Sequence, residues 1–393
     1  MIPMTPSRDE NLRLAVLGAF PFPLPQGSQV FMRELTRALT QAGARATVLT
    51  YGRGIGNPPE DLHCLSTPGW STPRSMRSGP HPGKPFADAL LWWAYRRATS
   101  QHVFDWAIAH NAEAAAIALA ARPQTGVPVV YVAHTILAQE LSAYGSKRCS
   151  AQLDRMGGRI DRLIAHKADA VVTLSDDGLS ALAPHSRGPI TMIPPGHTLE
   201  APPEASLIAR TCAEHQIKPD AYTLYSGNLD GYQELETLAR AAERLRDDSP
   251  PIVVATHDAQ RAANTSQALR QSLRIVSVKQ FESMRALIHG ARCLVLPRTR
   301  RGGFPIKLLN YMEAARPIVA LEGVAEGLQD GVSARLLPHP TDPSRLAEAL
   351  NELNLDRALR NRLGEGARTR LVTEHRWAPI GDRWRTFLES AER

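Results

Sequence analysis

The fold is decided by the stretch Pro297-Arg-Thr-Arg-Arg-Gly-Gly-Phe-Pro-Ile-Lys-Leu-Leu-Asn-Tyr-Met-Glu-Ala-Ala-Arg-Pro-Ile-Val319. Residues 293–296, just before it, form an apolar run with the composition of a buried strand, and a basic loop with two glycines follows. A helix is predicted from Pro305, because proline is well tolerated in the first turn of a helix. A strand, a glycine loop and a helix in this order predict one unit of an α/β sheet.

Positive charge gathers around the start of this predicted helix. Lys307 and Asn310 are three residues apart and should share one face of it. The basic residues of the preceding loop are Arg298, Arg300 and Arg301. Free amides at a helix N-terminus have partial positive charge, so the stretch predicts a site for an anion such as a diphosphate. The same residues also fit a buried crossover with a solvated basic loop, and both interpretations stay open at this point.

Length and composition narrow the class of protein. A chain of 393 residues is long enough for two or three domains. Its formal charge of +7 favours anionic ligands or an anionic membrane surface. Because the Lys and Arg residues are dispersed and form no nucleic-acid motif, we expect no nucleic-acid partner. The sequence indicates no particular oligomeric state.

Cysteine usage and hydropathy predict a cytoplasmic protein. The four cysteines are far apart and form no Cys-x-x-Cys pair, so reduced thiols are expected. The first eleven residues lack the apolar core of a signal peptide. The most apolar long stretch, residues 107–121, is interrupted by polar side chains and is not expected to span a bilayer. Peripheral attachment to the inner membrane face is an option that the basic charge leaves open.

Strand and helix patterns alternate along the whole chain. Residues 14–18 and 47–51 have the pattern of strands on either side of a predicted helix at 30–42, which makes a βαβ unit. Residues 52–86 are rich in Pro, Gly, Ser and Arg and are expected to be irregular. A Pro-Pro-Gly sequence at 194–196 predicts a domain boundary, after which the alternation restarts. We expect two doubly wound, Rossmann-like domains, 1–197 and 198–375, with the last helix, within 376–393, packing back on the first.

Five stretches, in the expected order, resemble motifs of the GT-B glycosyltransferases, in particular the large retaining family 4. They are residues 18–28, His134 at the end of a strand, Ser175 with residues 193–197, residues 224–229, and residues 303–319 with Asp330-Gly331 beyond. The resemblance covers roughly residues 12–388. It implies two Rossmann-like domains that face each other across a cleft, the first on the acceptor side and the second binding a nucleotide sugar.

The resemblance also implies a set of site residues. His134 would contact the transferred sugar as the catalytic residue, although a histidine at a strand end is also a common structural residue. Gly27 and Ser28 would lie at the donor phosphates, and the same pair suits a helix N-cap. The donor site for diphosphate, ribose and sugar is then expected to comprise Gly27, Ser28, Gly227, Asn228, Arg298, Gly303, Phe304, Ile306, Lys307 and Asn310. The residues expected on the acceptor side are Gln29, His110 and Asn111.

The sequence departs from the family pattern in two places. The usual signature has two glutamates eight positions apart, but here those positions hold Gly302 and Asn310. An amide at Asn310 can still bond a ribose hydroxyl, but an acceptor-only carboxylate is missing. The usual Arg and Lys that clamp the diphosphate are replaced by Asn228 and Gln233. Our hypothesis is that Arg298 and Lys307 supply the missing positive charge.

The function implied by the resemblance is a biosynthetic, metal-independent glycosyltransferase of hexosyltransferase type that retains the configuration of the sugar. The donor would be a UDP or GDP sugar, used as a substrate, so neither a cofactor nor a metal site is expected. The acceptor stays open among a cell-surface glycan, a lipid and a small metabolite such as a thiol. Two alternatives also stay open. One is a non-catalytic nucleotide-sugar-binding partner protein, which the missing glutamates favour, and the other is a sugar-nucleotide epimerase of the same fold, which would need carboxylates in the cleft.

Overall fold

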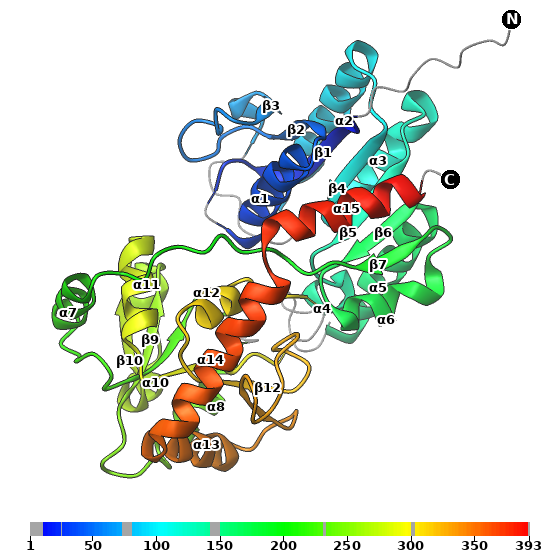
Figure 1. Ribbon diagram of the computed structural model, residues 1–393. Helices are drawn as coiled ribbons and strands as arrows, with labels where there is room; N and C mark the ends of the chain where they lie inside the picture. Colours follow the sequence, from blue (N-terminus) through cyan, green and yellow to red (C-terminus); the bar gives the residue numbers. More distant parts are fainter. Residues whose placement is uncertain are drawn as a thin grey trace, which may run out of the picture. The chain divides into compact units, whose positions relative to one another are not determined.

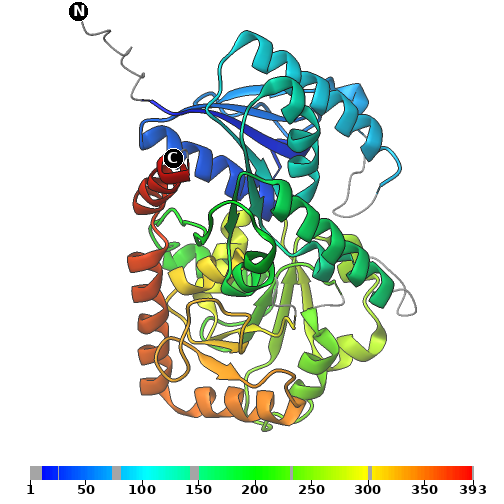
Figure 2. The ribbon, with the colours of Figure 1, turned by 90° about the vertical axis from the view of Figure 1, so that its right-hand side faces the viewer.

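The computed structural model describes residues 11–24, 26–72, 81–141, 150–230, 233–299 and 303–391. The chain forms two compact units, one made of Met1–Gly196 together with Trp377–Arg393 and the other of His197–Arg376. Each unit contains one parallel sheet with helices on both faces (Figures 1 and 2). The predicted α/β architecture of two Rossmann-like domains is therefore confirmed.

The first unit is built on seven parallel strands in the order β3-β2-β1-β4-β5-β6-β7. The strands are β1 Arg13–Pro21, β2 Arg45–Tyr51, β3 His63–Ser66, β4 Trp106–His110, β5 Val129–Ala133, β6 Ala170–Thr173 and β7 Ile190–Met192. The central strands β4 and β5 are buried at every position, as expected for a parallel sheet that is covered on both faces.

Helices cover both faces of this sheet. They are α1 Gly27–Gln41, α2 Lys84–Gln101, α3 Asn111–Thr125, α4 Leu137–Leu141, α5 Ser150–Lys167, α6 Asp176–Leu182 and α15 Trp377–Ala391, with the short 3-10 turns η1 Gly69–Ser71 and η2 Ala183–His185. Helices α2, α3 and α5 form the main core with β1, β4 and β5. Helices α1 and α15 pack against each other on the opposite face (Figure 2).

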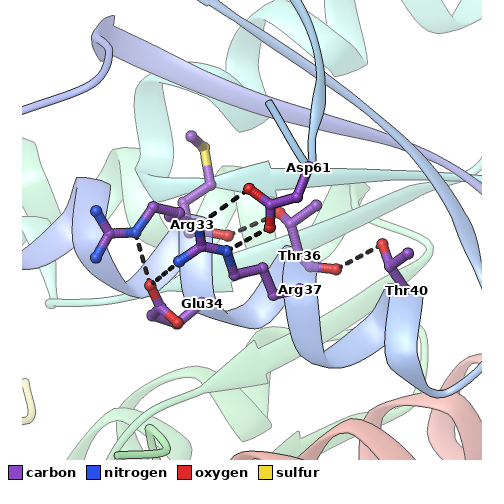
Figure 3. Close-up of polar contacts among 7 residues, drawn as sticks. Arg33, Glu34, Thr36, Arg37, Thr40 and Asp61 are labelled. Carbon is purple, nitrogen blue, oxygen red and sulfur yellow. Dashed lines mark hydrogen bonds and ion pairs between the residues drawn. The ribbon is translucent and has the colours of Figure 1, made fainter. Parts of the chain in front are cut away.

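Helix α1 is fastened to the connection between β2 and β3. The Arg37 guanidinium donates to the Asp61 carboxylate at 2.7 and 3.0 Å and to Glu34 Oε1 at 2.9 Å (Figure 3). Thr36 Oγ1 and Thr40 Oγ1 donate to carbonyls one turn earlier, at 2.7 and 2.9 Å. The helix starts at Gly27, earlier than the predicted residue 30, because Gln26 already has the extended conformation of an N-cap residue.

Helix α15 ends the chain and belongs to the first unit. Trp384 is fully buried, and Arg385 Nη1 donates to the Ala42 carbonyl at 2.7 Å. Gly381 permits close approach of α15 to α1, because a Cβ at this position would lie 2.7 Å from the carbonyl oxygen of Ala38 in α1. The last helix is thus held by packing and by a cap on the C-terminus of α1.

The second unit has six parallel strands in the order β10-β9-β8-β11-β12-β13. The strands are β8 Thr223–Ser226, β9 Ile252–Thr256, β10 Arg274–Ser277, β11 Cys293–Leu296, β12 Ile318–Leu321 and β13 Arg335–Leu337. The helices are α7 Ala205–Glu214, α8 Leu235–Ala242, α9 Ala259–Ala263, α10 Gln267–Ser272, α11 Phe281–Gly290, α12 Lys307–Glu313, α13 Pro343–Leu355 and α14 Arg357–Glu374.

Some elements differ from the sequence prediction. The helical pattern of residues 260–273 predicts a single helix, but the structure has two, because Ser266 caps the second by accepting a hydrogen bond from the Leu269 amide. Helix α12 starts at Lys307, after a tighter turn in which the Leu308 amide donates to the Pro305 carbonyl at 2.7 Å. Strands β3 and β13 were not predicted, because they have only 4 and 3 residues with at most one buried position each, and so have no long apolar run. Strand β3 lies inside the segment that was expected to be irregular.

The strand order reverses beside the first strand of each sheet. Strand β1 lies between β2 and β4, and strand β8 lies between β9 and β11. In doubly wound folds a crevice opens at the carboxyl ends of such neighbouring strands, and ligands bind there. Over the described ranges, no helix combines the length and the hydropathy that are needed to cross a membrane.

Candidate functional site

In the second unit, the carboxyl end of β8 meets the start of helix α12. Gly227 follows β8 with φ +143°, a backbone conformation that favours glycine. A Cβ at this position would lie 2.6 Å from Lys307 Nζ and 3.1 Å from Tyr225 Oη. Space and backbone conformation both require glycine here, and the lysine ammonium occupies the space that a side chain would fill.

Lys307 is held by neutral groups. Its ammonium donates to Tyr225 Oη at 3.0 Å and to Gln233 Oε1 at 3.3 Å, and it lies over the Tyr225 ring at 4.3 Å from the centroid. Burial, and then the charge of Arg298, lower the pKa of Lys307 to about 7, against a smaller opposing effect of Asp230. A cation with such a depressed pKa gains an electrostatic partner when an anion binds beside it.

The two side chains that replace the family's Arg and Lys bond each other. Gln233 Nε2 donates to Asn228 Oδ1 at 2.9 Å, and Asn228 Nδ2 donates to Asp230 Oδ2 at 2.7 Å. Asp230 also forms an ion pair with Arg261. The loop after β8 is therefore a polar network, and Gln233 connects it to Lys307.

Helix α12 is anchored to the sheet by Tyr311, which helical spacing places on the face of Lys307 and Asn310 but which is not among the expected site residues. Tyr311 is fully buried, and its hydroxyl oxygen accepts from the Ser226 amide at 2.7 Å. This bond fixes the start of α12 against the end of β8, where Gly227 and Lys307 meet. Tyr311 follows Asn310 in the quoted stretch, but a buried tyrosine has the same sequence pattern as an ordinary core residue.

Glu313 anchors the other end of α12 and was also missed. Its carboxylate accepts from the Glu200 amide at 2.9 Å and from Arg285 Nη2 at 3.2 Å, and His197 Nε2 lies 3.3 Å away. Burial alone would raise the pKa of Glu313, but His197, the Glu200 amide and Arg285 together lower it to about 2. The carboxylate is only 2% exposed, so its role is to hold the helix and the 197–201 segment together.

The remaining predicted donor residues of this unit differ in how far they are buried. Gly303 and Phe304 are buried, and the Phe304 ring packs at 5.4 Å from the ring of His375. Arg298, Ile306 and Asn310 are half-buried, on the loop after β11 and at the start of α12. Gly302, Arg300 and Arg301 lie outside the described residues.

A pocket of about 170 Å³ opens at the carboxyl ends of β11, β12 and β13. Its lining is mostly apolar, and Glu234, Thr237, Thr299 and Thr341 are its polar members. Two of these residues are sequence neighbours of Gln233 and Arg298, so the pocket adjoins the Lys307 site.

In the first unit, the ends of adjacent strands bring two histidines together. His110 ends β4 and His134 follows β5, and His110 Nδ1 lies 2.8 Å from His134 Nε2. The Phe31 ring of α1 contacts both imidazoles edge-on, with centroid distances of 5.8 and 4.9 Å. Trp377 in turn lies against Phe31 at 5.9 Å.

Both imidazoles are uncharged near neutral pH. Burial lowers the pKa of His134 to about 3. Burial and the neighbouring His134 hold the pKa of His110 well below its ordinary value. In the described part of the chain, His110 Nε2 is buried and has no hydrogen-bond partner. The pair is suited to a fixed hydrogen-bonding role rather than to proton uptake.

The other predicted residues of the first unit lie around this pair. Gly27 and Ser28 are the first residues of α1, and Gln29 is buried in its first turn. Asn111 starts α3 with φ +69°. The carboxyl edge of the first sheet thus gathers the α1 N-terminus, His110, Asn111 and His134. Across the described ranges, no cluster of three or more His, Cys, Asp or Glu side chains is placed to hold a metal ion.

Two family profiles match the chain. Residues 26–196 match the family described as "Glycosyl transferase 4-like domain", and residues 220–356 match "Glycosyl transferases group 1". The chain is 31% identical over 182 residues to the O-antigen chain mannosyltransferase C of Escherichia coli, a match that covers 44% of this chain and 48% of that protein. It is 23% identical over 394 residues to the D-inositol 3-phosphate glycosyltransferase of Actinosynnema mirum, which covers 90% of this chain and 92% of that protein. This chain therefore spans about half of the first relative and most of the second.

Solved structures share the fold. Sucrose-phosphate synthase from Thermosynechococcus elongatus superimposes with a TM-score of 0.78 at 18% identity, covering 97% of this chain and 99% of that one. HepE from Anabaena, in complex with UDP-glucose, superimposes with a TM-score of 0.74 at 14% identity, covering 97% of this chain and 100% of that one. At these identities the similarity concerns the arrangement of the elements.

Proposed function

Because this chain belongs to the GT-B glycosyltransferases, by the matches of both its domains and by its fold, we propose that it transfers a sugar from a nucleoside-diphosphate sugar to an acceptor and retains the configuration of the sugar. The second unit binds the donor, and the first unit provides the acceptor side. The donor is a UDP or GDP hexose. The bound UDP-glucose of HepE and the mannosyltransferase relative support this choice.

The observation that supports the proposal best is the Lys307 ammonium beside Gly227. A half-buried lysine held by a phenol and an amide has a pKa lowered to about 7, so its charged form is disfavoured in the absence of a ligand. A diphosphate would favour the charged form by pairing with the ammonium. Glycine at 227 leaves room for the Lys307 ammonium beside the backbone, where a phosphate oxygen would pair with it.

The chemistry follows from the charge that develops in the reaction. The bond between C1 of the sugar and the diphosphate oxygen breaks, and negative charge grows on the leaving diphosphate. Lys307 and Arg298 stabilise this charge where it forms. The acceptor attacks C1 on the face from which the diphosphate leaves, and its proton passes to a diphosphate oxygen. His134 contacts the sugar as a neutral hydrogen-bonding group, which agrees with its low pKa.

The acceptor is proposed to be a glycan chain or a small polyol. The printed names of the two curated relatives refer to an O-antigen chain and to an inositol phosphate. These names describe those proteins, and they give the acceptor classes to try first on this one.

Calorimetric titration of UDP, GDP and ADP tests the donor site. We expect one of the first two nucleotides to bind wild type and to bind Lys307→Ala at least about tenfold more weakly, since a charge-assisted contact is lost. Lys218→Ala is the matched control, because Lys218 is an exposed lysine before β8. Equal affinity in wild type and Lys307→Ala would refute the proposed diphosphate clamp.

Turnover separates the enzyme from a non-catalytic binding protein. One observation supports a non-catalytic binding protein, namely the absence of glutamate at positions 302 and 310. Incubation with UDP- and GDP-hexoses and a panel of glycan and polyol acceptors should release the nucleoside diphosphate. Nucleotide binding without any release across the panel would favour the non-catalytic function.

A further inference from the structure

Helix α2 is apolar on two opposite sides. Ala87, Leu91, Tyr95 and Ala98 face the core of the first unit and are buried. Phe86 and Trp93, which lie two turns apart on the other side, are 53% and 55% exposed. Leu90 falls between them at helical spacing and is half-buried. A solvated helix face is normally polar, so the outer side of α2 needs another explanation.

A second element extends this surface. Trp70, in the turn η1, is 71% exposed, and its ring lies 6.0 Å from the ring of Phe86. The α2 surface is defined here as Trp70, Phe86, Leu90, Trp93 and Arg97. Two exposed tryptophans and an exposed phenylalanine on one part of the first unit are more than scattered surface hydrophobics.

The charge around this surface is basic. Arg97 lies over the Trp93 ring at 5.5 Å, and Arg96 lies over the Trp92 ring at 4.7 Å. Asp88 is the acidic residue of α2, and it accepts from the Tyr51 hydroxyl at the end of β2. The outer side of the helix therefore presents aromatic rings and guanidinium groups without a carboxylate from α2.

The helix starts beside the candidate site of the first unit. Lys84, its first residue, donates to Glu113 Oε2 at 2.7 Å. Glu113 is in the first turn of α3, two residues after Asn111. The α2 surface thus begins at the edge of the sheet where the predicted acceptor-side residues lie.

We propose that the α2 surface docks on an anionic lipid bilayer. Tryptophan and phenylalanine bury an apolar body at the level of the headgroups, where arginine can contact lipid phosphates. Each basic residue near an anionic bilayer adds attraction, and this surface offers no acidic residue of α2 to oppose it. The basic charge of the sequence favours an anionic membrane surface as a partner, and the α2 surface is where we expect the contact. The proposal does not depend on the transfer reaction, because docking is measured without substrates.

Co-sedimentation of the full chain with vesicles tests the docking. The vesicles are phosphatidylcholine alone and phosphatidylcholine mixed with phosphatidylglycerol. Wild type should bind the mixed vesicles, and Phe86→Ser/Trp93→Ser should bind them about tenfold more weakly because the buried apolar area is lost. Arg96→Gln/Arg97→Gln should lose the preference for the anionic lipid. Leu355→Ser is the control, since Leu355 is 66% exposed at the end of α13 in the second unit.

Tryptophan fluorescence gives an independent readout. Trp70→Phe/Trp93→Phe retains the aromatic surface, so this variant should still bind but should lose the blue shift that wild type shows with vesicles. Far-UV circular dichroism and thermal unfolding of each variant show whether the unit is folded. Failure of wild type to bind the mixed vesicles overturns the proposal, and so does equal binding by a folded Phe86→Ser/Trp93→Ser variant. A dimer in sedimentation that only this variant dissociates, with vesicle binding unchanged, would instead assign the surface to a second copy of the chain.

Discussion

His110 Nδ1 lies 2.8 Å from His134 Nε2, at the ends of two neighbouring strands. The bond contains one hydrogen, so one ring donates and the other accepts. Both rings are buried and share the Phe31 ring as a neighbour. We infer that His110 fixes the orientation of the His134 imidazole, and the expected contact of His110 with an acceptor stays a prediction.

Burial of this pair makes the stability of the first unit depend on pH. The pKa of His134 is about 3 in the folded unit, below its ordinary value of 6.5. Between these values the unfolded chain binds the proton and the folded unit does not, so stability falls as pH decreases from about 6.5 toward 3. When the pH falls from 7 to 5, the free energy of unfolding should decrease in both proteins. The decrease should be about 2 kcal/mol smaller in His134→Gln than in wild type.

Urea unfolding at the two pH values checks this expectation. His166→Gln, which removes an exposed histidine of α5, is the control. If His134→Gln and wild type lose the same free energy on acidification, His134 is protonated in the folded unit and the pair is not neutral.

Nucleotide binding should depend on pH through Lys307. Its pKa is about 7 in the absence of a ligand, below the ordinary 10.5, so a growing share of the side chain is neutral above neutral pH. A bound diphosphate favours the charged form and raises this pKa. Affinity should therefore decrease as pH rises from 7 to 9, and binding near neutral pH should take up a proton.

Calorimetry in buffers of different ionisation enthalpy measures that proton uptake. Lys307→Arg keeps its charge throughout this range, so it should bind without proton uptake and with a flatter pH profile. A wild-type affinity that is constant over the same range would show that Lys307 is already charged, or that it does not contact the nucleotide.

The sequence predicted which strands, loops and helices contribute to the site, but it predicted few of the contacts between their side chains. Gly227, Asn228 and Lys307 were predicted to belong to one site because the quoted stretch and the loop after β8 match family motifs in order, and in the structure they are neighbours. The contact between His110 and His134 was not predicted. It depends on β4 and β5 being adjacent, and on where each strand ends, which the periodicity of one strand does not determine.

The anchoring roles of Tyr311 and Glu313 were not predicted, for a related reason. Their importance comes from buried partners that are distant in sequence, the Ser226 amide at 2.7 Å and the Glu200 amide at 2.9 Å. In the sequence they are a tyrosine and a glutamate on a helix, which fit equally well on a core face and a solvated face. The lack of an apolar run at β13 likewise hid the last strand of the second sheet.

Gly227→Ala should abolish nucleotide binding and destabilise the second unit. The new Cβ would lie 2.6 Å from Lys307 Nζ, and φ of +143° is strained for alanine, so a loss of about 2–3 kcal/mol is expected. Gly331→Ala is the matched control. Gly331 has φ +70° but nothing within 4 Å of its Cβ position, so about 1 kcal/mol of strain and unchanged nucleotide affinity are expected. Equal nucleotide affinity in wild type and Gly227→Ala would mean that the ligand does not approach this loop.

Glu313→Gln should destabilise the second unit more than any surface substitution. Glu313 is 2% exposed and faces Arg285, which would lose its buried partner but keep an ion pair with Glu200, so a loss of about 2–3 kcal/mol at pH 7 is expected. The folded pKa of about 2 lies below the ordinary 4.5, so this stability is present above pH 4.5 and is lost as pH falls through 2.

Urea unfolding of wild type and Glu313→Gln at pH 7 measures the difference. Glu322→Gln, at an exposed position of the same unit, should change stability by less than about 0.5 kcal/mol. If Glu313→Gln is no more harmful than this control, α12 is held by Tyr311 and apolar packing alone, and the ion-pair network has no part in placing Lys307.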